Sequence, residues 1–189
     1  MKICIYLTLL IMISCASQTE DQALTKLDQA WQQFELRHYS AAIDLFKQVI
    51  TESKNLEASV GLGYSYMFLS DYFNSTLILT QAYSDYGNKA DLLAALVLVL
   101  NAEGQDLTTS NLFADELLIV DPQWKFGHQL NLTVNDIYLV QAQNYYLLGD
   151  FVKSIEMIQL LDSTFNADIS TEAGKLELGE QIDNMNPGL

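Results

Sequence analysis

The chain has 189 residues, and its 24 acidic and nine basic side chains give a formal net charge of −15. Half of its residues are hydrophobic, which is enough for a sizeable core, while nine glycines and two prolines are too few for a collagen-like or disordered chain. We expect no nucleic-acid partner, because binding a phosphate backbone requires clustered lysine and arginine. The acidity is typical of a surface kept soluble by charge repulsion, and the alternative is an acidic face for a basic partner.

The N-terminal residues 1–18 read MKICIYLTLLIMISCASQ. The apolar run is too short for a membrane-spanning helix, which needs about 20 residues, but has the length of a secretory signal. The sequence Met-Ile-Ser-Cys that ends at Cys15 resembles the signal of bacterial lipoproteins, with methionine where leucine is preferred. This resemblance implies a signal peptide over 1–14, lipidation at Cys15 and a lipidated tether over 15–22. An uncleaved N-terminal anchor is the alternative.

The residue after Cys15 bears on the membrane that the lipid anchor selects. Ala16 stands where many Gram-negative lipoproteins that stay at the inner membrane have aspartate. The resemblance therefore implies a place at the outer membrane, facing the periplasm.

Four segments between residues 38 and 162 share one hydrophobic pattern: HYSAAIDLFKQVI, DYFNSTLILTQAY, DLTTSNLFADELL and DFVKSIEMIQLLD. Their second residues act as anchors, and small or apolar residues recur three, seven and ten positions later, along one face of a helix. The anchors are Tyr39, Tyr72, Leu107 and Phe151. An aspartate precedes three of these anchors and is a good N-cap, whereas His38 precedes the first and should cap less well.

A second helix is predicted before each anchor. Nine residues before the anchors stand Ala30, Gly63 and Ala142, small residues that let helices approach closely, with Leu98 as the exception. A helix pair repeated about every 34 residues resembles the tetratricopeptide repeat, and the pieces LRHYSAAIDLF and LGDFVKSI match it well. The resemblance implies an all-α solenoid of four repeats over 23–168; another helical-pair solenoid is the alternative.

The spacing between the third and fourth repeats exceeds the period, which predicts an insert over 123–134. Thr133, with Asp136 three residues later, is a plausible start for the helix that follows. Two interpretations of Trp124, Phe126 and His128 stay open. The aromatic residues pack over the junction of repeats three and four, or the insert is a loop that contacts a ligand.

Residues 169–189 are predicted to form a capping helix and a tail. Leu178, Ile182 and Met185 make one apolar stripe over 170–185, and acidic residues fill the opposite side. A solenoid needs such a helix to close its last hydrophobic face.

The inventory for catalysis is thin. His38 and His128 are the only histidines, and no phosphate loop or nucleophile motif is present. We therefore expect neither enzymatic activity nor a metal or cofactor.

In tetratricopeptide proteins the first helices of the repeats line an inner groove that takes peptides. The resemblance carries this role to Trp31, Phe34, Tyr64, Met67, Phe68 and Tyr146. Large aromatic residues are enriched at binding hot spots. The alternative is that these side chains pack on one another as core.

Together these features predict a lipid-anchored adaptor that holds another protein of an envelope complex. The chain is similar to the small repeat-containing lipoproteins that assist outer-membrane protein assembly or type IV pilus assembly. Two alternatives stay open: a periplasmic small-molecule or lipid-binding protein whose pocket is roofed by the 123–134 insert, and an enzyme.

Overall fold

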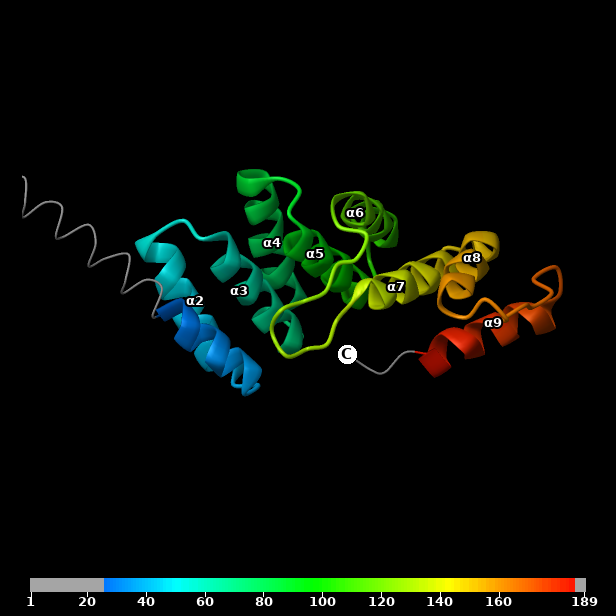
Figure 1. The fold of residues 1–189 in the computed structure, drawn as a ribbon, viewed down its shortest axis with the longest axis horizontal. Coiled ribbons are helices and arrows are strands. Elements are labelled where there is room, and N and C mark those ends of the chain that lie inside the picture. Colours follow the sequence, from blue (N-terminus) through cyan, green and yellow to red (C-terminus); the bar gives the residue numbers. More distant parts are fainter. Residues whose placement is uncertain (1–25, 186–189) are drawn as a thin grey trace, which may run out of the picture.

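A computed structural model describes residues 26–185 as an all-α array of packed helix pairs (Figure 1). A helical segment over residues 26–35 comes first. The helices that follow are α2 (Tyr39–Glu52), α3 (Leu56–Phe68), α4 (Tyr72–Tyr86), α5 (Ala90–Glu103), α6 (Leu107–Val120), α7 (Val134–Leu147), α8 (Phe151–Leu161) and α9 (Glu172–Met185). The predicted signal peptide, Cys15 and the tether lie outside the described residues. Within 26–185 no helix has the length and hydrophobicity needed to cross a bilayer.

The array is a solenoid in which each pair packs on the next, and the predicted fold class is confirmed. Segment 26–35 pairs with α2, α3 with α4, α5 with α6, and α7 with α8, while α9 lies against α7 and α8 as the predicted capping helix. Its stripe is buried at Leu178 and Ile182 and half-buried at Met185.

The four predicted anchors are the first residues of α2, α4, α6 and α8. The side chains of Asp71, Asp106 and Asp150 each accept a hydrogen bond from the backbone N–H three residues later, at 3.1–3.2 Å. The side chain of His38 makes no such bond at the start of α2. The prediction of three good caps and one poor cap is therefore confirmed.

The first helix of each repeat is here called the inner helix and the second the outer helix. In three repeats, a serine near the start of the outer helix is hydrogen-bonded to the inner helix. Its buried Oγ donates to a backbone carbonyl of the inner helix at 2.8–2.9 Å. The pairs are Ser75 with Gly63, Ser110 with Val97, and Ser154 with Ala142. Because this bond fixes which residues face each other, it defines the register of each helix pair.

This register corrects the prediction for the third repeat. In the third repeat the serine bonds to the carbonyl of Val97. Val97, and not Leu98, is therefore equivalent to Gly63 and Ala142, and the predicted alignment of Leu98 with these two residues was wrong. The cause is the turn. The residue with positive φ stands two positions before the anchor in the other repeats, but Gly104 stands three before Leu107. One extra residue in this turn shifts the preceding helix by one position.

The buried hydrophobic residues form two clusters. The larger one runs from segment 26–35 through α6 and the loop after it to Ile137 and Val140 of α7. The smaller one lies within α7–α9 and includes Leu139, Ile155, Ile158, Leu178 and Ile182. The contacts between α5, α6 and α7 that join the two clusters include several buried polar side chains.

Candidate functional site

The loop between α6 and α7, residues 121–133, is here called the strap. It leaves α6, extends back toward the start of the solenoid and returns to α7 (Figure 1). Two backbone bonds of 2.9 Å close its base, from the N–H of Phe126 to the carbonyl of Leu132 and from that of Val134 to the carbonyl of Trp124. The capping pair predicted at its end is confirmed, since the N–H of Thr133 donates to the Asp136 carboxylate at 2.7 Å.

Side chains of the strap alternate between the protein and the solvent. Trp124, Phe126 and Leu132 are buried, and His128 is half-buried. The residues between them are exposed: Lys125, Gly127, Gln129 and Asn131. One side of the strap is therefore part of the core.

Trp124 and Phe126 of the strap contact different repeats. Trp124 Nε1 donates to the carboxylate of Asp91 in α5 at 2.8 Å. The Phe126 ring packs on the ring of Tyr64 in α3, with centroids 4.7 Å apart. The strap thus covers the inner face of the first three repeats. The interpretation that Trp124 and Phe126 pack over the junction of repeats three and four was wrong, because Phe126 packs on aromatic residues of repeats one and two.

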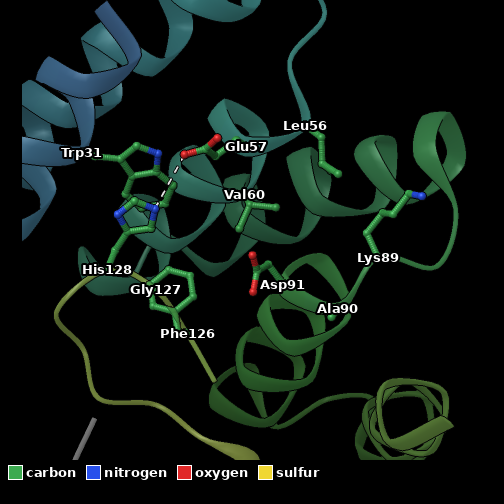
Figure 2. Close-up of a pocket in the computed structure, with 10 residues that line it drawn as sticks. All are labelled: Trp31, Leu56, Glu57, Val60, Lys89, Ala90, Asp91, Phe126, Gly127 and His128. Atoms are coloured by element: carbon green, nitrogen blue, oxygen red, sulfur yellow. Dashed lines mark ion pairs between the residues drawn. The ribbon is translucent and has the colours of Figure 1, made fainter. Parts of the chain in front are cut away.

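The tip of the strap is held at repeat one by His128. Its ring stacks on Trp31 with centroids 3.6 Å apart and planes 5° apart. Its two nitrogens face carboxylates. Nδ1 lies 3.4 Å from Glu35. Nε2 lies 3.7 Å from Glu57, and this pair is drawn in Figure 2. Gln129 donates to the other oxygen of Glu35 at 3.1 Å. The tip is therefore fixed by stacking and by polar contacts together.

The structure places the residues predicted for the partner groove in two groups. Trp31, Phe34, Tyr64 and Met67 are buried, with Trp31 5% and Tyr64 0% exposed. Phe68 and Tyr146 are half-buried. The strap thus fills the groove of the first three repeats, and a role of these residues in partner binding stays a prediction.

A cavity of about 360 Å³ lies between the strap and the N-terminal ends of α3 and α5 (Figure 2). Trp31, Val60 and Phe126 form its apolar walls. Its charged residues are Glu57, Lys89 and Asp91. The sequence predicted a pocket roofed by the insert, but it gave no signal for the acidic residues that the fold brings to it.

Two buried polar atoms near this cavity have no hydrogen-bond partner among the described residues, Trp31 Nε1 and the Tyr64 hydroxyl. Burial raises the pKa of Tyr64 well above its ordinary value of 10.0, and the negative charge of Asp91 raises it further. Tyr64 therefore keeps its proton in the folded protein at all physiological pH values.

A second hollow, of about 190 Å³, lies between α7 and α9 on the part of the array that the strap does not cover. Leu147 is 61% and Leu176 60% exposed beside the half-buried Tyr146. Glu180 and Asp183 also line it. We call it the α7–α9 groove. Among the described residues, no three histidine, cysteine or acidic side chains are placed to hold a metal ion.

No protein-family model and no curated protein sequence matches the chain. Solved structures do. MamA AMB-1 superimposes with a TM-score of 0.64 at 12% identity, covering 90% of this chain and 94% of its own. A tetratricopeptide repeat protein from Parabacteroides merdae gives 0.62 at 12% identity, covering 87% and 61%. A thermophilic TPR protein of Thermus thermophilus gives 0.57 at 17% identity, covering 86% and 82%. The chain therefore has the helical-pair solenoid fold of tetratricopeptide repeat proteins.

Proposed function

We propose that the chain is a scaffold protein of the bacterial cell envelope, anchored through a lipid on Cys15 at the outer membrane and facing the periplasm. It binds a partner protein on the inner side of its solenoid and acts by binding rather than by catalysis. The observation that carries this proposal is the α7–α9 groove, where Leu147 and Leu176 are exposed beside Tyr146. Contiguous exposed apolar surface of this kind is typical of protein contact sites.

The chemistry of the groove defines the partner. Leu147, Leu176 and Ile182 are apolar residues of its lining, which also includes the acidic residues Glu180 and Asp183. The whole chain is strongly acidic. A partner segment with a large apolar residue flanked by lysine or arginine is complementary to this surface in both respects.

The test is crosslinking and co-purification from native membranes. The Leu147→Ser, Leu176→Ser double variant of the full chain should lose the partner that the wild type recovers. The matched control is Leu112→Ser, Ile119→Ser, which removes exposed apolar side chains from α6. Recovery of the partner by both double variants would contradict the groove as its site.

A separate arm tests the anchor. The Cys15→Ser variant should lose incorporation of labelled palmitate and leave the membrane fraction. A variant that stays in the membrane fraction would contradict lipid anchoring while leaving the groove proposal intact.

The cavity under the strap favours a second candidate function, the binding of a small molecule. It has apolar walls, a few polar groups and a volume of about 360 Å³, within the range of small-ligand sites. Because it lies under the strap and the other groove lies between α7 and α9, the two functions are separable by mutation.

A further inference from the structure

We propose that the cavity under the strap binds a small organic cation, namely an ammonium group on an apolar body with a neighbouring oxygen. This inference rests on the second candidate function, since it names the ligand class of that site. It does not depend on the partner groove between α7 and α9.

The apolar part of the ligand has a defined place. Trp31 from segment 26–35, Val60 from α3 and Phe126 from the strap contribute side chains to the cavity from three directions (Figure 2). The face of an aromatic ring carries negative potential. His128 covers one face of Trp31, and the aromatic surface that remains at the cavity favours a cation as well as an apolar group. An apolar amine therefore matches these walls better than an apolar anion does.

The charged side chains of the cavity also favour a positively charged ligand. Glu57 and Asp91 bring two carboxylates, while Lys89 is the one lysine or arginine that lines the cavity. Neither carboxylate is paired with lysine or arginine within residues 26–185. Glu57 faces only His128 Nε2, at 3.7 Å, and Asp91 accepts a hydrogen bond from Trp124. A ligand ammonium supplies the missing positive charge.

The unpartnered nitrogen of Trp31 is an independent indication of a ligand. Trp31 is 5% exposed, and its Nε1 has no acceptor among the described residues. Figure 2 shows this nitrogen on the side of the ring that faces Glu57. A buried N–H without a partner lowers the stability of the protein. An oxygen next to the ammonium group of the ligand would accept from this N–H and remove that cost.

The chain offers a direct readout of binding. Its only two tryptophans are Trp31, which lines the cavity, and Trp124, which anchors the strap that covers it. We would titrate the full chain at neutral pH with three compounds that share a benzyl body and an oxygen. These are phenylalaninol, a cation; N-acetylphenylalaninol, which is neutral; and N-acetylphenylalanine, an anion. Tryptophan fluorescence should change with phenylalaninol at the lowest concentration and with the anion at the highest.

A matched pair of variants assigns the effect to the cavity. Glu57→Gln removes one carboxylate from it and should weaken phenylalaninol binding roughly three- to tenfold. Glu156→Gln removes the same charge from the exposed side of α8 and should leave binding unchanged. Equal weakening by both variants would overturn the proposal, because it would show a general charge effect.

The remaining outcomes separate this inference from the function beneath it. Equal affinity for the cation and the neutral compound would contradict the ligand class while leaving a small-molecule site in place. Absence of binding by all three would overturn both. Tighter binding of Phe-Ala-Ala-Ala-amide than of phenylalaninol would assign the ammonium to a peptide N-terminus and contradict a free amine.

Discussion

Tyr64 carries its hydroxyl group into the core of the first three repeats. The side chain is 0% exposed and packs against Phe126 of the strap, and the oxygen has no partner among the described residues. A buried hydroxyl in that position lowers stability, because it gives up its bonds to water without replacement. The ring of Tyr64 therefore stabilises the fold, and its hydroxyl does not.

We expect Tyr64→Phe to leave the free energy of unfolding at pH 7 unchanged or to raise it by up to about 1 kcal/mol. The variant should also resist alkali better. The pKa of Tyr64 is raised in the folded state, so above pH 10.0 the unfolded chain loses this proton first and the wild type loses stability as the pH rises. Urea unfolding at pH 7 and at several values above 10 measures both effects.

The contributions of the other tyrosines are common to both proteins and cancel in the difference. A loss of more than about 1 kcal/mol for Tyr64→Phe at pH 7 would show that the hydroxyl is hydrogen-bonded in solution.

At the scale of the element, α2 is the one outer helix of a repeat without an aspartate cap. The backbone at His38 has φ −85° and ψ 60°, close to −88° and 65° at Asp71 and −87° and 69° at Asp150. The backbone at the start of α2 therefore already has the conformation of the capped helices. What it lacks is a side chain that accepts a hydrogen bond from the backbone N–H groups of the first turn.

We expect His38→Asp to raise the free energy of unfolding by about 1 kcal/mol, because the new carboxylate can accept a backbone N–H at the helix start and interacts favourably with the helix dipole. Chemical denaturation measures the change. His38→Ala is the control, since it removes the exposed contact with Gln33 without adding a cap. Equal stability of the two variants would contradict capping as the cause.

Helix starts were predictable here, and the strap was not, for a physical reason. The caps and the apolar face of α4 or α8 depend on residues within a few positions of one another, so a local pattern determines them. The stacking of His128 on Trp31 depends on which surface the assembled repeats leave uncovered. The near-alternation of apolar and polar residues over 124–132 was the one local signal of an extended segment with a buried side.

The positions of the site residues were likewise predictable where local sequence determines them, and not where the assembled repeats do. The register predicted Trp31 and Tyr64 on the inner face, where the structure has them, but could not show that the chain covers that face itself. The α7–α9 groove depends on how α9 docks, and of its exposed residues neither Leu147 nor Leu176 was identified from the sequence.

At the scale of the whole molecule, the two hydrophobic clusters meet at a polar junction. Asn144 is fully buried there. Its Nδ2 donates to Ser110 Oγ at 2.9 Å and to Asn111 Oδ1 at 3.0 Å, and its Oδ1 accepts from Asn101 at 2.8 Å. One side chain thus joins α7 to both helices of the third repeat.

We expect Asn144→Ala to lower the free energy of unfolding by about 2–4 kcal/mol, because it leaves several buried polar groups without partners. Amide hydrogen exchange should quicken over α7–α9 more than over α2–α5. The control is Gln143→Ala, whose side chain accepts one bond, from Asn101 at 3.2 Å, and which should cost less than about 1 kcal/mol. A uniform rise in exchange along the whole chain would indicate a single cooperative unit.

The strap also changes how the array folds. In an ordinary repeat protein each unit contacts only its neighbours, so folding can start anywhere and propagate, and units can be removed from an end. Here the bond from Gln129 to Glu35 joins residues 94 positions apart. Such a contact raises the contact order and makes the first repeat a folding partner of the loop after the third. The first three repeats should therefore behave as one closed domain, and deleting the first would leave the aromatic side of the strap without its support.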